Sequence, residues 1–555
     1  GGPARVGDAA LGRATKAFLG GADFAAGPPV KPRLTLPSKY MGGGLRKRTQ
    51  VRLAAYAGSL ITAVKDFSTR RARDGSVRVG FFPSLAPSLG GESYTCESAL
   101  LGHYLAAGSP AAVALEEAWQ SMREEIAGCS KTGPLDGPIT GGAAGIKAHL
   151  QREITKHREL AAVEKFKGEM KELMTAGAWG QIKPGDMRAN AYLSCDGLSN
   201  QLLTALPNKH YFLSPTDFSD ALARYLGCAL PSIRLEGLEG KLMPCNSLSG
   251  EGRRRGRVCD AYGHEMELAK LPDNTVHAES TTLEKTVYGT LKYAGFDPRW
   301  QDKLMFKGAT SERPAIVPDV TCRLAYDEGP TLEYIYDIKT SRVSSSTIGY
   351  NTRASYDKPH GAMDARAAQV PREYLAKARK ADRDAAAGAP SNNSDPDQED
   401  EDFYLGVDTT TTPSHCPGPM ETKLRAKPEP IGLCFGAYGE ASQGVHNLIK
   451  VVAEELAAER GHELGVGKER QVGIFVQRVR CAWGMAAIRA RARSRAMRKP
   501  LVGCSRLQAQ GLVAGSCVAP RTRRSQGDAH LETLDAITWA EDSGSRMSRD
   551  ARCEA

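Results

Sequence analysis

The part of the sequence that decides the fold reads Glu312-Arg-Pro-Ala-Ile-Val-Pro-Asp319 and, further on, Tyr336-Asp-Ile-Lys-Thr340. Between these stretches lies Asp327-Glu-Gly-Pro330, which is a strong turn signal. β-Branched and aromatic residues are frequent on both sides of that turn, as is typical of strands. The sequence therefore predicts two antiparallel strands, at 315–326 and 331–340, joined as a hairpin.

Charged side chains of this hairpin are expected to converge. Asp337 and Lys339 share one face of their strand because side chains alternate along a strand. A turn centred on 327–330 places Asp319 opposite about residue 338, so a bulge or a register shift of one residue would bring it beside both. The pattern predicts a cluster of two carboxylates and one lysine.

Two converging carboxylates form a hard oxygen site that suits Mg²⁺ or Mn²⁺. A metal held by Asp319 and Asp337 would polarise a phosphate and lower the pKa of an attacking water. Lys339 can orient that water or neutralise charge on the reacting phosphate. A carboxylate on the preceding helix commonly completes such a site, and Glu284 is the first choice, with Glu279 behind it. The alternative is a surface hairpin that carries ordinary charged residues.

Helical patterns flank the hairpin. One helix is predicted at 280–294, before the strands, and another at 362–383, after them. The order α-β-β-α predicts an α/β fold class, in which a mixed sheet is flanked by helices. Gln369 and Tyr374 lie on the second helix, which is expected to be solvated and to face DNA in part.

The rest of the chain divides by composition and periodicity. Further helices are predicted at 51–64, 98–128, 146–176, 214–226, 445–460 and 472–497. The predicted segments are a loop or linker at 1–45, an α-helical N-terminal region at 46–205, a Cys- and His-containing region at 212–278, the hairpin core at 279–384, a disordered acidic and Thr-rich linker at 385–428, a basic helical tail at 430–500 and a disordered end at 501–555.

Composition limits the class of protein. The longest apolar stretch, at 53–64, is too short to span a bilayer, and no secretory segment is visible. The 13 cysteines have no regular spacing, which favours a reducing compartment over a disulfide framework. We therefore expect a soluble, intracellular protein without a membrane partner. The chain starts with Gly rather than Met, which suggests a fragment of a longer product.

The net charge of +10 is unevenly distributed, with basic clusters at 45–48, 70–73, 253–257 and 489–499. Such clusters can follow a phosphate backbone and release its counterions. Ordinary solvated surface is the alternative for any single cluster. The residues predicted to bind nucleic acid are Arg253, Arg254, Arg255, Arg372, Lys377, Arg379, Arg489, Arg491 and Arg493.

The middle of the chain resembles the region downstream of the polymerase in non-LTR retrotransposon proteins. Those proteins carry a Cys/His knuckle, a short His-containing motif and a restriction-like PD-(D/E)XK endonuclease. Here Cys245, Cys259 and His264 look like the knuckle, His277 lies where the second motif is found, and 319–339 matches the nuclease motif. The similarity is clearest over 212–383. The region 46–205 would then be a remnant of the polymerase thumb or connector.

The resemblance implies a metal-dependent DNA endonuclease with a restriction-endonuclease-like core. Such an enzyme nicks target DNA to prime reverse transcription, so the expected partners are a DNA duplex and the element RNA, in the nucleus. The expected cofactors are Mg²⁺ or Mn²⁺, together with Zn²⁺ on a ligand set of Cys245, Cys259, His264 and His277, with Cys228 as a further candidate.

The chain departs from that pattern in ways that leave alternatives open. Cys245 and Cys259 are separated by thirteen residues, and the further knuckle Cys is missing near Ala269. No Tyr/Phe-x-Asp-Asp polymerase signature occurs. A nucleic-acid-binding module that has lost catalysis is one alternative, and a non-functional relic of a mobile element is another.

Overall fold

The computed structural model describes residues 13, 30–44, 69–71, 77–79, 150–175, 184–205, 211–243, 257–269, 277–307, 316–324, 332–342, 361–386 and 417–504. The chain divides into two compact units, Gly1–Glu172 and Leu173–Ala555. The predicted helices at 51–64 and 98–128 lie outside the described residues.

The first unit contains short elements and most of one long helix. Its elements are α2 (Val30–Thr35), η1 (Ser38–Tyr40), the antiparallel pair β1 (Thr69–Arg71) and β2 (Val77–Val79), and α7 (Leu150–Thr175), whose last residues belong to the second unit. The helix predicted at 146–176 is confirmed in α7. Within this unit, Lys39 Nζ lies 3.1 Å from the Glu159 carboxylate.

The second unit begins with small helices. They are α8 (Pro184–Ser194), α9 (Gln201–Thr204), α10 (Pro215–Leu226), α11 (Pro231–Leu235) and α12 (His264–Leu268), with the strand pair β3 (Leu242–Met243) and β4 (Arg257–Val258) between the last two. The helix predicted at 214–226 is confirmed in α10. Ser214 caps it, because its hydroxyl accepts a hydrogen bond from the Asp217 N–H at 3.1 Å.

A mixed four-stranded sheet organises the rest of this unit. Its strands are β5 (Asp297–Trp300), β6 (Val320–Leu324), β7 (Leu332–Thr340) and β8 (Ile431–Phe435), hydrogen-bonded in that order. β6 pairs antiparallel with both β5 and β7, and β8 pairs with β7 in parallel. A parallel neighbour requires a crossover connection, which passes through helices here. The predicted α/β class and the hairpin are both confirmed.

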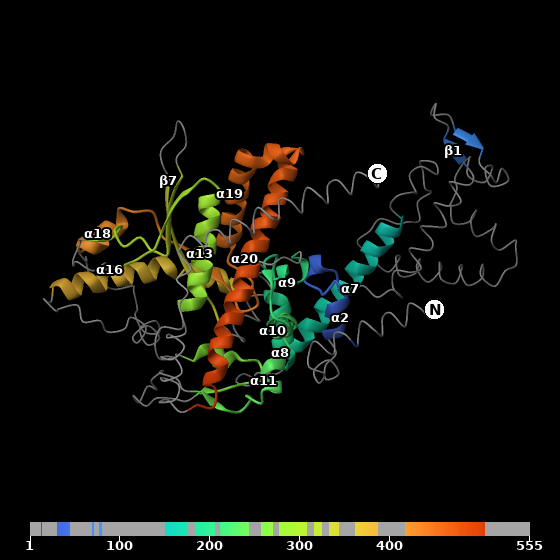
Figure 1. The fold of residues 1–555 in the computed structure, drawn as a ribbon, viewed down its shortest axis with the longest axis horizontal. Coiled ribbons are helices and arrows are strands. Elements are labelled where there is room, and N and C mark those ends of the chain that lie inside the picture. Colours follow the sequence, from blue (N-terminus) through green and yellow to red (C-terminus); the bar gives the residue numbers. More distant parts are fainter. Residues whose placement is uncertain are drawn as a thin grey trace. The chain divides into compact units, whose positions relative to one another are not determined.

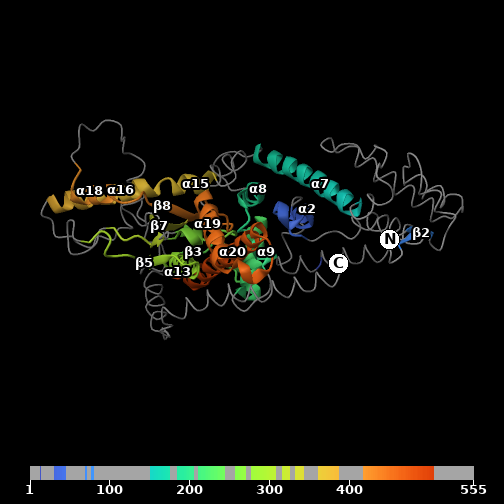
Figure 2. The ribbon, with the colours of Figure 1, turned by 90° about the horizontal axis from the view of Figure 1, so that it is seen from above.

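Helices cover both faces of the sheet. They are α13 (His277–Tyr293), α15 (Gly361–Ala367), α16 (Val370–Ala386), α18 (Pro419–Arg425), α19 (Gln443–Arg460), η5 (Gly461–Leu464), α20 (Lys468–Arg498) and η6 (Lys499–Leu501). α16 and α18 lie along one side of the sheet, and α13 lies on the other, beside the long helix α20 (Figures 1 and 2). In the part of the chain that the structure describes, no helix is both long and apolar enough to cross a membrane.

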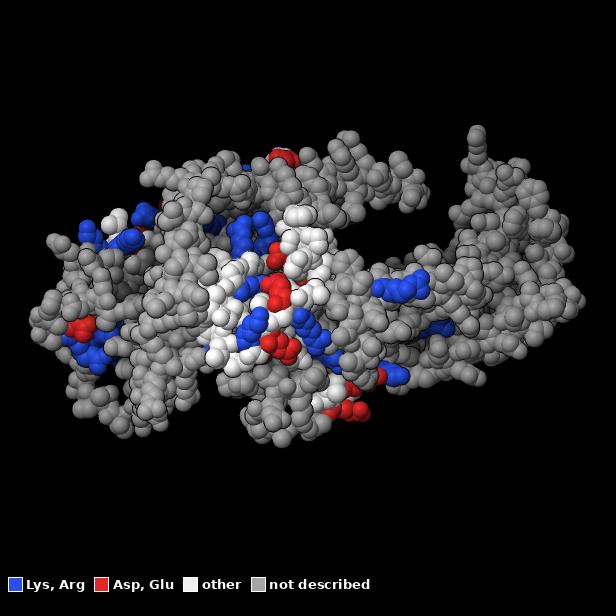
Figure 3. All heavy atoms as spheres, turned by 60° about the horizontal axis from the view of Figure 1, so that its bottom comes forward, with Lys and Arg blue, Asp and Glu red and all other residues white. Residues whose placement is uncertain are grey.

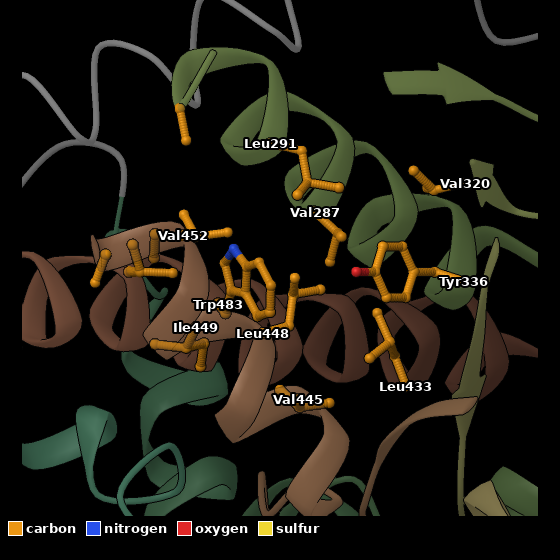
Figure 4. Close-up of a cluster of buried hydrophobic side chains, with 14 of the residues drawn as sticks. Val287, Leu291, Val320, Tyr336, Leu433, Val445, Leu448, Ile449, Val452 and Trp483 are labelled. Carbon is orange, nitrogen blue, oxygen red and sulfur yellow. The ribbon is translucent and has the colours of Figure 1, made fainter. Parts of the chain in front are cut away.

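The main core lies between the sheet and the helices α13, α19 and α20. Trp483 of α20 is fully buried there, among Val287 and Leu291 of α13 and apolar residues of α19 (Figure 4). Its indole N–H donates to the Thr290 hydroxyl at 2.9 Å. A smaller core on the other face contains Ile335 of β7 with side chains of α16 and α18.

Close approach of the crossover to the sheet depends on Gly432. A Cβ at this position would lie 2.7 Å from Ala367 Cα and 2.9 Å from Val370 Cγ2. Any larger residue would push the start of α16 away from β8. This glycine therefore holds α16 close to the neighbouring strand β7.

Several sequence predictions need correction. The helix predicted at 362–383 is two helices, with a break at Ala368 and Gln369. The predicted disordered linker at 385–428 contains α18, and the strands β5 and β8 were not predicted. The predicted tail at 430–500 supplies β8, α19 and α20, so it completes the sheet and covers it. Short strands of four or five residues give weak local signals, because only pairing stabilises them.

Replacing Trp483 with Ala is expected to lower the free energy of unfolding by roughly 3–5 kcal/mol, because the core cannot close fully over the cavity. Urea titration of the full chain, followed by circular dichroism, measures the change. The control is Val451→Ala on α19, whose side chain is 40% exposed. Equal losses in the two variants would contradict the described core.

Candidate active site

The alternation of side chains along β7 separates apolar from charged residues. Tyr336 and Ile338 point into the main core, whereas Ile335 points to the opposite face, toward α16. Asp337 and Lys339 share the face of Ile335, because residues two apart point to the same side of a strand. The two charged residues therefore lie under α16.

Asp319 precedes β6 directly and lies across from Asp337. The register pairs Val320 with Tyr336, and one further step sets Asp319 opposite Asp337. The Asp319 carboxylate also accepts a hydrogen bond from the Ile338 N–H at 2.6 Å. The sequence predicted that Asp319 lies opposite about residue 338, and that a register shift of one residue would bring it beside Asp337 and Lys339. In the observed register Asp319 lies opposite Asp337, which is a shift of one residue.

Two groups hold the Asp337 carboxylate. Lys339 Nζ lies 2.7 Å from Asp337 Oδ2, and the Tyr374 hydroxyl donates to Asp337 Oδ1 at 3.0 Å. Tyr374 is 2% exposed, so the expectation that it lies on a solvated face was wrong. Next to it on α16, Glu373 pairs with Arg366. The apolar stripe of Val370, Tyr374 and Ala378 was the sequence signal for an inward face.

Glu284 of α13 lies near enough to Asp319 for its charge to raise the pKa of that carboxyl. It is buried, and it accepts hydrogen bonds from Trp300 Nε1 at 2.9 Å and Gln301 Nε2 at 3.3 Å. The Gln301 N–H donates to the Asp319 carbonyl at 2.9 Å, so one residue contacts both acids. Gln301 has φ of 46°, a left-handed conformation that is uncommon outside glycine. The sequence analysis had no signal for Gln301.

The site holds more negative than positive charge. The pKa of the Asp319 carboxyl is raised to about 8, chiefly by burial and then by the nearby Asp337 and Glu284 carboxylates, although Lys339 and the Ile338 N–H act to lower it. The ammonium of Lys339 is partly buried, which opposes its charge, but the Asp337 carboxylate raises its pKa above the ordinary value. Burial and the same carboxylate raise the pKa of Tyr374, so its hydroxyl stays protonated and remains a donor.

The donor set fits a hard divalent cation. Asp319 and Asp337 offer carboxylate oxygens on one face of the sheet, and the excess negative charge around them favours a cation. Among the described residues, no group of three or more His, Cys, Asp or Glu side chains is placed to hold a metal ion. Mg²⁺ commonly takes only one or two carboxylates and fills its other positions with water and substrate phosphate. Two aspartates are therefore a sufficient protein contribution.

The predicted zinc ligands are described only in part. Burial raises the pKa of the Cys259 thiol to about 11, and its sulfur donates to the Asp260 carbonyl at 3.8 Å. Burial lowers the pKa of His264 to about 4, and neither of its ring nitrogens has a hydrogen-bond partner within the described part of the chain. Cys245 and the side chain of His277, the first residue of α13, lie outside the described residues. Bound zinc stays a prediction.

The residues predicted to bind nucleic acid fall into three groups. Arg253, Arg254 and Arg255 lie outside the described residues, whereas Arg372, Lys377 and Arg493 are exposed and Arg489 is half-buried. Arg379 pairs with Glu421 of α18 at 3.1 Å. Arg491 is buried and donates to the Ser341 carbonyl at 2.8 Å, so it does not lie on the exposed basic surface, and its contact with nucleic acid stays a prediction. One face of α20 packs inward, and charge alone could not reveal which face that is.

No protein family, no curated protein and no solved structure matched this chain in the three comparisons. The function must therefore be argued from the geometry of the site.

The raised pKa of Asp319 predicts a stability that depends on pH. In the absence of divalent cations, the folded chain keeps a proton on Asp319 that the unfolded chain loses above its ordinary pKa of about 3.9. The free energy of unfolding that the neutral carboxyl contributes should therefore decrease as the pH rises from 4 to about 8, by at most about 1.4 kcal/mol per pH unit. Asp319→Asn lacks this group, so its stability relative to the unsubstituted chain should rise across that window.

Denaturant titrations in EDTA at pH 5, 6.5 and 8 measure this difference. Glu429→Gln, at an exposed position before β8, is the control for the loss of one carboxyl group. A constant difference between the Asp319→Asn and unsubstituted chains would show that Asp319 ionises normally.

Proposed function

We propose that this chain is a metal-dependent endonuclease that hydrolyses phosphodiester bonds of DNA through Asp319, Asp337 and Lys339. The observation that carries the proposal is the convergence of these three side chains on one face of β6 and β7, with Glu284 adjacent. The order of one helix, three antiparallel strands, a helical crossover and a parallel strand supports a restriction-endonuclease-like core. The resemblance to retrotransposon tails supports DNA nicking as the role.

Each residue has a distinct part in the proposed reaction. Asp319 and Asp337 would hold Mg²⁺ or Mn²⁺, which supplies a polarised phosphate and a water of lowered pKa when bound. Lys339 lies beside Asp337 and can orient the attacking water or offset charge that develops on the phosphate. Tyr374 donates to Asp337 and keeps its carboxylate in one orientation. Phosphodiester hydrolysis is accelerated by this combination of positioning and electrostatic stabilisation.

The surface offers cations for a phosphate backbone. On the face shown in Figure 3, Lys and Arg side chains gather over the described part, with a few carboxylates between them. Arg372 and Lys377 are exposed on α16, the helix that covers the candidate site. Backbone contacts of this kind position a duplex without reading its sequence.

The proposal predicts that the full chain nicks supercoiled plasmid in Mg²⁺ or Mn²⁺, and not in EDTA. Asp337→Asn and Lys339→Met should each reduce the rate at least roughly 100-fold, because each removes a group that acts on the reacting phosphate. Asp297→Asn, at an exposed position on β5 of the same sheet, is the matched control and should nick normally. If the unsubstituted chain binds plasmid but does not cut it, a binding module without catalysis replaces the endonuclease.

Tyr374→Phe tests the positioning of Asp337. Loss of a hydrogen bond to a charged group costs about 1.5–3 kcal/mol, so nicking should slow roughly 10- to 100-fold. The variant should need more Mg²⁺ for half-maximal rate, which a purely structural role would not require. Tyr288→Phe, on α13 against the main core, is the control. An unchanged Mg²⁺ dependence would remove Tyr374 from the site.

A further inference from the structure

A small hollow lies where α9, α10, the turn after β8 and α20 meet. It is partly open to solvent. Three of its lining residues are arginines, namely Arg224 of α10 and Arg491 and Arg495 of α20. The remaining walls are small or aromatic residues, among them Ala221 and Tyr438. The hollow is therefore a concave site in which guanidinium groups are the main polar lining.

The three arginines share one carboxylate. Arg224 Nη2 lies 2.6 Å from Glu267 Oε1, Arg495 Nη1 lies 3.5 Å from the same atom, and Arg491 Nη1 lies 3.9 Å from Glu267 Oε2. All three side chains are at least nine-tenths buried. Even so, Arg224 Nε and Nη1 and Arg495 Nε have no hydrogen-bond partner among the residues that the structure describes. Buried guanidinium donors without an acceptor are costly, so a bound acceptor is expected at this site.

Neighbouring acids leave positive charge at the hollow. Glu267 is ionised, because the arginines lower its pKa to about 2 against the effect of burial. Burial raises the pKa of Glu440, which faces Arg491, to about 7, so it contributes only part of a charge. Asp220 and Asp196 have their own partners, Lys499 at 3.5 Å and His446 at 2.8 Å. Three guanidinium groups thus face little more than one carboxylate.

The hollow is connected to the strand that carries the candidate active site. Arg491 Nη2 donates to the Ser341 carbonyl at 2.8 Å, and Ser341 lies two residues beyond Lys339. The same guanidinium group lies 3.4 Å from the carbonyl of Phe435, the last residue of β8. A group bound in the hollow would therefore lie next to a side chain that contacts the carboxyl ends of β7 and β8.

We propose that this hollow binds a phosphate group, which on the proposed function is a backbone phosphate of the nucleic acid that the chain cuts. Arginine forks recognise phosphate oxygens through paired N–H donors, and buried arginines do so with little loss of side-chain freedom. A free phosphate compound offers the same chemistry, and the experiment separates the two sources.

The first test measures thermal unfolding of the full chain in inorganic phosphate and in NaCl of equal ionic strength. Phosphate should raise the midpoint by at least about 2 °C more than chloride, because a ligand of the folded state stabilises it. Ala221→Leu fills the hollow without removing a charge, and it should abolish the difference. Arg495→Lys keeps the positive charge but loses the paired N–H donors of the guanidinium group. It should reduce the difference between the midpoints in phosphate and in chloride. Arg478→Lys, at a buried α20 position outside the hollow, is the matched control.

A second test identifies the source of the phosphate. Duplex DNA binding is measured at several salt concentrations in an Asp337→Asn background, with and without Ala221→Leu. If the ligand is a backbone phosphate, Ala221→Leu should lower the slope of log K against log salt by about 1. An unchanged slope together with a lost phosphate effect would assign the hollow to a free phosphate compound, which supports the phosphate site and removes its link to DNA.

Two results would overturn the phosphate site. One is a midpoint that responds equally to phosphate and chloride in the unsubstituted chain. The other is a phosphate effect that Arg478→Lys removes as fully as Ala221→Leu does. If the chain shows the phosphate effect but does not nick DNA, the phosphate site is supported and the endonuclease proposal is refuted. The two proposals can therefore fail separately.

Discussion

The pairing of β7 on both of its edges is the constraint on which the rest of this fold depends. β7 is antiparallel to β6 and parallel to β8, and helices cover both faces of the sheet. A slip of one residue would turn Tyr336 and Ile338 out of the main core and bring Asp337 into it. Burial of apolar area therefore fixes the register, and the register fixes where the charged side chains meet.

The position of the charged cluster lowers the stability of the fold. Asp319, Asp337 and Glu284 lie close enough to raise the pKa of one of them, with a single lysine to oppose it. Charges taken out of water are costly unless they are paired. The surrounding structure holds them through specific donors, which are the Ile338 N–H, the Tyr374 hydroxyl and the indole of Trp300. Such crowding is more common at functional sites than in structural ion pairs.

α20 combines two roles in one helix. Its first half packs Phe475, Val479 and Trp483 into the main core. Its second half turns Arg491 and Arg495 toward Glu267, and Arg498 donates to the carbonyls of Met266 and Ala269 at 3.0 and 2.8 Å. Hence the small helices before the sheet and the last helix of the described chain are joined through buried arginines. One face of a stretch that the sequence presents as a basic surface stripe is thus packed inside the second unit, while Arg493 stays exposed.

Local patterns in the sequence were enough to predict the hairpin, its charged residues and the helices with clear periodicity. Alternation along a strand and the turn at 327–330 are local, so they placed Asp337 and Lys339 on one face and Asp319 near them. The Glu284 choice followed from its position on the preceding helix, and the structure sets its carboxylate close enough to Asp319 to affect the pKa of that residue.

Only the tertiary structure decided which faces of α16 and α20 are buried and which strand completes the sheet. β8 lies more than ninety residues beyond β7, and its pairing depends on a crossover that no local pattern encodes. Tyr374 and Arg491 have side chains that are as suited to solvent as to a buried hydrogen bond. Their roles follow from partners distant in the chain, Asp337 and Ser341, because long-range packing rather than local preference brings those groups together.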